Sequence, residues 1–363
     1  MKPVIQVTPY YPPHLGGVEV AAQTIAESLA ATRPVEVLTS TAGAGDRPRL
    51  ERRGQLTVRR LRSLELANTP VAPTLGWHLL RQRRDCIVHV HIAQALTPEI
   101  VWLTSRLRGR PFIAHFHLDV DPSGPAGRWL AAYKRLVLAR VLRAAASVIV
   151  LSEDQASFVR DQYGVERITV VPNGVPAGFA PGVAEARPAA APLRLLFVGR
   201  LSPQKNLPRL LEALSLMREP AELTIVGDGP ELAGLTGLAA RLGLGNLNFA
   251  GPQEHDRLGA WYRRADVFVL SSDKEGMPLA ALEAMSFGLP VVATDVPGLR
   301  ELCADAGLLV APEPAALAAA LDSLAADPAA RQVLARQSMA RASGAGWERS
   351  LEQIEDLYLG VGR

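Results

Sequence analysis

Residues 193–217 read "LRLLFVGRLSPQKNLPRLLEALSLM". The first part has the length and apolar character of a buried strand, and the last part is a Leu/Ala-rich run long enough for a helix. The same change recurs along the chain, for example in VIQVTP followed by GGVEVAAQTIAESLA. Strands that alternate with helices on this scale predict parallel sheets with crossover helices.

Six strands are predicted in each half of the chain. They are residues 4–8, 35–38, 87–91, 112–117, 148–151 and 168–171 in the first half, and 195–199, 223–226, 247–250, 267–271, 291–294 and 308–310 in the second. The segment between them, NGVPAGFAPGVAEARPAAAP, is dense in Pro, Gly and Ala, which is typical of a linker. Two doubly wound α/β domains joined there are expected to bind ligands at the carboxyl ends of their strands, in a cleft between them.

The expected domain limits follow from this pattern. We expect an N-terminal domain over residues 1–175, a linker over 176–192 and a C-terminal domain over 193–345. The amphipathic run GWERSLEQIEDLYLG follows a Gly-rich break, and we expect it, at about 346–363, to return to the first domain.

Length and composition exclude several classes of protein. The chain has 363 residues, of which 48% are hydrophobic and 21% charged, so it is globular rather than disordered. No signal peptide and no apolar run of spanning length is indicated, and Cys86 and Cys303 fit no metal spacing. We therefore expect a cytoplasmic protein with reduced thiols.

Charge is distributed unevenly between the halves. Residues 1–180 hold 22 Lys/Arg and 14 Asp/Glu, whereas residues 181–363 hold 17 and 22. In a basic run over 127–145, apolar residues are interspersed with cations, among them Trp129, Leu130, Val137, Leu138 and Val141 with Lys134, Arg135, Arg140 and Arg143. This run fits a helix on an anionic membrane surface, at the inner membrane face, or a domain helix with one face in the core. No nucleic-acid-binding motif accompanies the basic residues.

Two acids bracket a predicted helix start in SSDKEGMPLAALEAMSFGLPVVAT, residues 271–294. Pro278 suits the first helical turn, where free N–H groups and the helix dipole favour an anionic or hydroxyl-rich ligand. Glu275 in the loop and Glu283 on the second turn could accept hydrogen bonds from sugar and ribose hydroxyls. The alternative is a solvated loop acid and a helix-surface acid.

Cations follow the strand of the opening stretch. Arg200 and Lys205 suit a diphosphate, although two surface cations would give the same pattern. Gly16 and Gly17, between a strand and a helix, would let the backbone approach a phosphate. The segment IVGDGPE lacks the third glycine of the dinucleotide fingerprint, which argues against a nicotinamide enzyme.

Taken in order, these motifs resemble the family 4 glycosyltransferases of GT-B architecture. The resemblance rests on GGVE, VVPNGV, VGRLSPQKN, VGDGP, the E-x7-E element with EAMSFGLPVVAT, PGLRE and the helix that begins at Trp347. It implies two Rossmann-like domains facing across a cleft. It also implies transfer of a hexosyl group from a nucleotide diphosphate sugar, a UDP-sugar by family frequency, to an acceptor hydroxyl on a small metabolite or lipid-linked glycan.

The resemblance assigns residues to the donor. Arg200 and Lys205 match the family's diphosphate-binding cations, and Glu283 matches the acid that binds the ribose. Gly16 and Gly17 match the glycines that approach the diphosphate from the first domain.

Further residues match the part of the family's site where the sugar reacts. Glu275 matches part of the segment that holds the donor sugar, together with the backbone of Gly276, Met277, Pro278 and Leu279. His117 matches a His beside the reacting sugar, and His115 is expected on the other face of its strand. The implied catalytic set is therefore His117, Arg200, Lys205 and Glu275.

The family retains anomeric configuration and needs no divalent metal, so no cofactor is expected. The DVD triplet, Asp119 to Asp121, resembles a metal-binding DxD of another glycosyltransferase architecture but falls in the acceptor domain. In HVH, His89 and His91 are expected on opposite strand faces, unable to chelate jointly; His91 is expected either in the acceptor cleft or in the core.

Some positions depart from the family pattern, and two alternatives stay open. Pro176 follows VPNGV where Asp is usual, and Met277 and Pro278 stand where many members have aromatic and Gly residues. A sugar-nucleotide epimerase would share the two-domain architecture, and a non-catalytic scaffold would share the fold.

Overall fold

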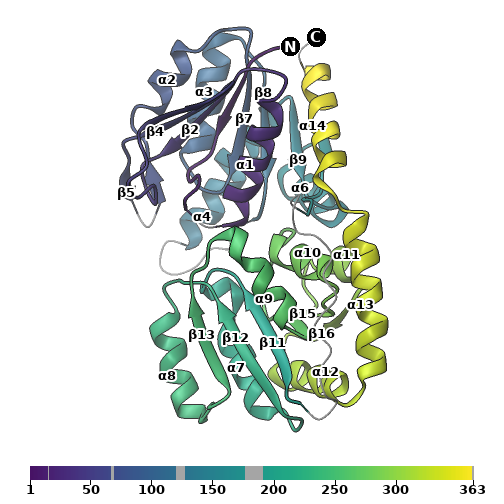
Figure 1. Cartoon of the computed structure of the whole chain (residues 1–363). Helices are drawn as coiled ribbons and strands as arrows, with labels where there is room; N and C mark the ends of the chain where they lie inside the picture. Colours follow the sequence, from purple (N-terminus) through teal and green to yellow (C-terminus); the bar gives the residue numbers. More distant parts are fainter. Residues whose placement is uncertain (15, 67–68, 120–126, 176–190, 362–363) are drawn as a thin grey trace. The chain divides into compact units, whose positions relative to one another are not determined.

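A computed structural model describes residues 1–14, 16–66, 69–119, 127–175 and 191–361, which fall into two compact units (Figure 1). The first comprises Met1–Pro172 with Glu348–Arg363, and the second comprises Asn173–Trp347. Residues 173–175, expected in the first domain, thus group with the second unit. The reason is backbone pairing, because Val175 forms a bridge with Gly346 and its N–H donates to Ala345 O at 2.8 Å.

The first unit contains an eight-stranded sheet in the order β10-β9-β8-β7-β1-β2-β4-β3. Its strands are β1 (Val4–Val7), β2 (Val35–Ser40), β3 (Leu50–Arg53), β4 (Leu56–Leu61), β7 (Ile87–Ile92), β8 (Phe112–Phe116), β9 (Ser147–Val150) and β10 (Ile168–Val170). All are parallel except β3, which runs antiparallel to β4. The strands β5 (Leu64–Leu66) and β6 (Thr69–Val71) form a separate antiparallel pair.

Most helices of the first unit connect its successive strands, and the last one follows the helices of the second unit in the chain. They are α1 (Gly17–Leu29), α2 (Leu75–Arg81), α3 (Thr97–Arg108), α4 (Gly127–Tyr133), α5 (Ala139–Ala144), α6 (Glu153–Tyr163) and α14 (Trp347–Val361). A π-helical turn, η1 (Lys134–Leu138), joins α4 to α5.

The second unit is a six-stranded parallel sheet in the order β13-β12-β11-β14-β15-β16. Its strands are β11 (Leu193–Val198), β12 (Ala221–Val226), β13 (Leu247–Gly251), β14 (Val267–Leu270), β15 (Val291–Thr294) and β16 (Gly307–Val310). Its helices are α7 (Leu207–Leu216), α8 (Leu232–Leu242), α9 (Leu258–Arg264), α10 (Leu279–Ser286), α11 (Arg300–Cys303), α12 (Pro314–Ala326) and α13 (Pro328–Ser343), with 3-10 turns η2 (Pro203–Lys205) and η3 (His255–Arg257). Strand order reverses between β11 and β14, which makes their carboxyl ends a topological switch point.

All twelve predicted strands are present, each with ends within two residues of the prediction. The sequence prediction missed the short strands β5 and β6. It also missed β3 and β4, because the segment ERRGQLTVRRL is rich in arginine. These strands form one edge of the sheet, where polar side chains can reach solvent.

The large sheet of the first unit has two buried faces. One face packs Val88, Val90 and Ala114 against Leu79 of α2 and Val101 of α3. The other face is covered by α1 and α14, and in Figure 1 α1 lies across the near side of the sheet while α2 and α3 lie behind it. This second face carries polar side chains, which matter for the site. No helix in the described part of the chain is long and apolar enough to cross a bilayer.

Candidate active site

The two cations predicted to bind diphosphate lie beyond the carboxyl end of β11, at the switch point of the second sheet. Arg200 is exposed, and its guanidinium has no hydrogen bond or ion pair with any other residue that the structure describes. Lys205 ends η2, and its side chain is 18% exposed. An exposed cation without a partner is available to an anionic ligand.

Lys205 and Glu275 form a partly buried ion pair. Lys205 Nζ lies 2.6 Å from Glu275 Oε1, and the hydroxyl of Ser272 donates to the same oxygen at 2.5 Å. The Glu275 side chain is only 5% exposed. Because a buried carboxylate needs a compensating charge, Lys205 and Glu275 act as a unit, which the sequence did not reveal.

Two glycines let a neighbouring loop support Arg200. A Cβ on Gly227, where φ is +139°, would lie 1.9 Å from Gly199 O, and a Cβ on Gly229 would lie 2.3 Å from Leu201 O. The N–H of Leu201 also donates to Asp228 O at 2.9 Å. The glycines of the VGDGP motif therefore let its backbone pack directly against the backbone on either side of Arg200.

The loop after Glu275 is held from two sides. Gly298 has φ +86°, and a Cβ there would lie 2.1 Å from Gly276 O and 2.3 Å from Glu275 O. On another side, Asn173 Nδ2 donates to Met277 O at 2.9 Å. Asn173 is buried, so the NG turn fixes the backbone of the predicted sugar-binding segment. Pro278 is the N-cap of α10, and Leu279 begins the helix.

Glu283, predicted to bind ribose, lies buried on α10 with a protein partner for each oxygen. Its Oε1 contacts His255 Nε2 at 2.7 Å, and its Oε2 accepts from the Tyr262 hydroxyl at 2.7 Å. Burial and the adjacent carboxylate raise the pKa of Tyr262 well above its usual value. A carboxylate oxygen can accept more than one hydrogen bond, so these contacts leave acceptor capacity on Glu283.

Sequence reasoning missed His255 and Tyr262. They follow β13 in GPQEHDRLGAWY and are seven residues apart, which places them on one side of two helical turns. That spacing was a usable signal, but their partner Glu283 could not be identified without the packing of α9 against α10.

In the first unit, an acid lies at the start of α1 where the glycine pair was expected to meet phosphate. Gly16 is the N-cap, Gly17 begins the helix, and the Glu19 carboxylate folds back over Gly16. His14 Nδ1 contacts Glu19 Oε1 at 2.9 Å. A carboxylate at a helix N-terminus satisfies the dipole that a phosphate would otherwise meet.

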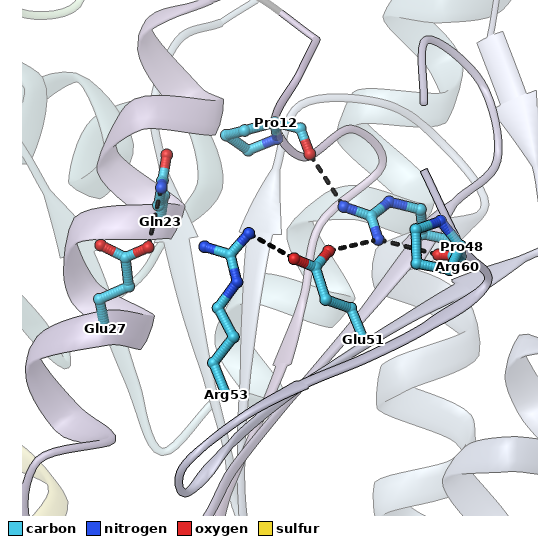
Figure 2. Close-up of polar contacts among 7 residues, drawn as sticks. All are labelled: Pro12, Gln23, Glu27, Pro48, Glu51, Arg53 and Arg60. Carbon is cyan, nitrogen blue, oxygen red and sulfur yellow. Dashed lines mark hydrogen bonds and ion pairs between the residues drawn. The ribbon is translucent and has the colours of Figure 1, made fainter. Parts of the chain in front are cut away.

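A buried arginine anchors the loop that precedes this glycine pair (Figure 2). Arg60 on β4 is 4% exposed and donates to Pro12 O at 3.0 Å, to Pro48 O at 3.0 Å and to Glu51 at 3.1 Å. Arg53 also pairs with Glu51. The β1–α1 loop is therefore fixed to the β3–β4 hairpin.

Two predictions about histidine faces are wrong. The rings of His89 and His91 stack with centroids 4.7 Å apart, and those of His115 and His117 stack at 4.2 Å. Side chains on a strand alternate with a period of two, so residues two apart share a face. Strand register then places His91 beside His115, and the four rings form one histidine array.

The histidine array, His89, His91, His115 and His117, is neutral at ordinary pH. Burial lowers the pKa of His89 and of His117 to about 3, and it lowers the pKa of His91 and of His115 well below the usual range. Ligand nitrogens of His89, His91 and His115 lie within 4.8 Å of one another, as a metal site would require. However, the rings stack at 14° to 27°, so their lone pairs do not converge on one ion. The arrangement is a hydrogen-bonded array.

Asp119 of the DVD triplet has protein partners. Its oxygens contact Lys134 Nζ at 2.8 Å and the Tyr163 hydroxyl at 2.7 Å. Asp121 lies outside the described residues. Leu138 and Val141 of the basic run point into the core, which agrees with the domain-helix interpretation of that run.

Comparison with known proteins gives concordant matches. The family model described as glycosyl transferases group 1 matches residues 185–341, and glycosyltransferase family 4 matches residues 15–179. A D-inositol 3-phosphate glycosyltransferase of Frankia alni is 35% identical over 75% of this chain and 73% of that protein. A glycogen synthase of Mycobacterium tuberculosis is 32% identical over 78% of this chain and 70% of that protein.

A solved structure shows the same architecture over the whole chain. The Anabaena protein HepE, in complex with UDP-glucose, matches with a TM-score of 0.80 and 21% identity over 99% of this chain and 100% of that chain. The predicted GT-B fold is thereby confirmed, and the sequence relatives favour a glycosyltransferase over an epimerase or a scaffold. This chain belongs to the family 4 glycosyltransferases.

Proposed function

We propose that this chain transfers a hexosyl group from a UDP-sugar to an acceptor hydroxyl, with retention of configuration and without a metal. The observation that carries the proposal is Arg200, an exposed cation with no partner among the described residues, beside Lys205 at the switch point of the second sheet. The HepE structure, with UDP-glucose bound on the same fold, supports the choice of donor.

The donor-binding roles are distributed over several elements. Arg200 and Lys205 would hold the diphosphate, and Glu283 the ribose. The fixed backbone of residues 276–279 would hold the sugar. The rigid support of these loops reduces the cost of ordering them on binding.

The proposed chemistry is electrostatic. Charge develops on the departing diphosphate, where Arg200 and Lys205 would stabilise it. Glu275 is held by Lys205 and Ser272, which suits a structural and sugar-binding role better than that of a free nucleophile. Retention would then arise by attack of the acceptor on the face that the diphosphate leaves, with a phosphate oxygen taking the acceptor proton and His117 beside the sugar. The acceptor would be a small metabolite or a lipid-linked glycan.

Calorimetric titration of UDP, GDP and ADP, each with common sugar conjugates, tests the donor site. One nucleotide, expected to be UDP, should bind selectively, and Arg200→Ala should weaken it about tenfold or more because charged hydrogen bonds are lost. Arg241→Ala, at the end of α8, removes an exposed cation remote from the switch point and should leave affinity unchanged.

Titration and turnover assays in the presence of EDTA, with NMR of the product, test metal independence and retention. EDTA should leave both binding and turnover intact, and the product's anomeric configuration by NMR should match that of the donor. Failure of every nucleotide to bind a folded protein would contradict the proposal. Loss of turnover in EDTA that manganese restores would return Asp119 and Asp121 to consideration.

We also propose that the first unit has a membrane-facing surface. The packed helices α2 and α3 expose Trp77 (54%), Leu103 (53%) and Leu107 (65%). Exposed arginines at or just beyond the ends of these helices accompany them, namely Arg81, Arg84 and Arg106. Apolar side chains beside cations suit an anionic lipid surface.

Vesicle flotation tests this surface. The chain should float with vesicles that contain anionic lipid, and it should not float with vesicles made only of zwitterionic lipid. Changing both Leu103 and Leu107 to Glu should abolish flotation without changing nucleotide affinity. Equal flotation of this double variant and the wild type would reject the surface.

A further inference from the structure

A buried polar array lies on the face of the first unit's sheet that α1 and α14 cover. Gln6 on β1, His91 on β7 and His117 beyond β8 form one hydrogen-bonded row across three neighbouring strands. Gln6 and His91 are fully buried, and His117 is 5% exposed. Only the last member of this row reaches the surface.

The orientation of the Gln6 amide is fixed by its surroundings. Gln6 Nε2 lies 2.7 Å from Ala22 O, a carbonyl oxygen that can only accept. The atom there must therefore be the amide nitrogen, which has a second proton. That proton points to His91 Nε2 at 2.8 Å. His91 Nε2 is consequently an acceptor and carries no proton.

The tautomer of His91 then determines the tautomer of His117. A neutral His91 whose Nε2 accepts must carry its proton on Nδ1, and it donates this proton to His117 Nε2 at 2.7 Å. Burial keeps both imidazoles neutral at ordinary pH. His117 in turn must carry its proton on Nδ1, for which no hydrogen-bond partner is found among the described residues.

We propose that Gln6 and His91 are positioning residues that fix His117 as the Nδ1–H tautomer, so that it offers the sugar an N–H donor. The group it meets must accept, which makes it a hydroxyl or ring oxygen of the donor sugar, or an oxygen of the departing diphosphate. The inference rests on the proposed role of His117 beside the sugar. Beyond that role, it states that His117 is the donor of the hydrogen bond and that Gln6 and His91 fix its tautomer.

A second row provides an internal control. The Tyr358 hydroxyl lies 2.5 Å from His89 Nδ1, and His89 Nε2 lies 3.2 Å from His115 Nδ1. This row ends at His115 Nε2, which is buried without a partner. It stacks against the first row but shares no hydrogen bond with it among the described residues. Loss of the Tyr358 hydroxyl should therefore perturb packing on the same sheet face and leave the His117 tautomer alone.

Long-range proton–nitrogen NMR on the full chain labelled with 15N-histidine reads the tautomers directly. The wild type should show His117 and His91 neutral, both with the proton on Nδ1. His91→Leu should abolish this preference at His117 and lower kcat about tenfold, the effect of one hydrogen bond, with a smaller change in KM. His91→Asn places an amide N–H near the position of Nδ1 and should restore both the tautomer and most of kcat. Tyr358→Phe should change neither.

Three results would overturn the inference. They are a wild-type His117 protonated on Nε2, an unchanged tautomer in His91→Leu, and an equal loss of kcat in Tyr358→Phe and His91→Leu. Failure of the proposed function looks different. A chain that shows the expected tautomers but binds no nucleotide sugar would keep the tautomer assignment and reject the transferase site.

Discussion

Replacing Lys205 with alanine is expected to lower kcat by on the order of 100-fold at saturating donor and acceptor. The substitution removes a positive charge from the site proposed for the departing diphosphate. It also leaves the Glu275 carboxylate, 5% exposed, without the cation that lies 2.6 Å away. Loss of one partner of a buried pair is costly for the partner that remains. Steady-state kinetics with the thermal midpoint measured in parallel would check this.

A double variant separates the two contributions of Lys205. If Lys205 serves only to neutralise Glu275, then Lys205→Met combined with Glu275→Gln should be as active as Glu275→Gln alone, because the uncompensated charge has gone. If Lys205 acts on the diphosphate, the double variant should stay as inactive as Lys205→Met alone. We expect the second result. Recovery in the double variant would contradict a catalytic role for Lys205.

The parts of the fold that could be predicted are those determined by local sequence. A strand such as β14, VFVL, is an uninterrupted apolar run, and a buried parallel strand favours that pattern. By contrast, β4 alternates buried Leu56 and Val58 with partly exposed residues, and its arginines hid that alternation. The buried Arg60 is stabilised there by Glu51 and two carbonyl groups from other segments, which no local pattern reveals.

The sequence singled out individual candidate residues of the site, but it could not predict the contacts between them. Arg200, Lys205, Glu275 and Glu283 were identified from their places after strands and at a helix start. The contact between Lys205 and Glu275 joins residues 70 positions apart, and that between His255 and Glu283 joins residues 28 positions apart. Both depend on strand order and helix packing. The error about the histidine faces was different, because the period of two was enough to place His89 with His91 and His115 with His117.

Acid is expected to unfold the first unit before the second. The histidine array is buried and neutral in the folded state, with the pKa of His89 and of His117 lowered to about 3, whereas an unfolded histidine titrates near 6.5. Below about pH 6.5 the unfolded chain thus binds more protons than the folded one. The stability due to neutral burial is therefore present above that pH and is lost as the pH falls toward 3.

The size of this effect follows from the lowered pKa of His89 and of His117. When the pH falls from 7 to 5, each of these two histidines should lower the free energy of unfolding by about 2 kcal/mol. His91 and His115 should lower it further. A domain has only roughly 5 to 15 kcal/mol in total, so the thermal midpoint of the first unit should fall by roughly 10 °C or more. Calorimetry at pH 7, 6 and 5 would measure the fall, and hydrogen exchange of β7 and β8 would assign it to this unit.

Two variants identify the source of the acid sensitivity. His115→Leu removes the ring whose Nε2 is buried without a partner, so it should flatten the dependence of the midpoint on pH whatever it does to stability at pH 7. His255→Gln changes a histidine of the second unit that is 31% exposed, and it should leave the first unit's dependence unchanged. A first unit equally stable at pH 5 and pH 7 would show that the array accepts protons while folded. In that case His117 would not be held neutral, and its N–H would be set by pH and not by Gln6 and His91.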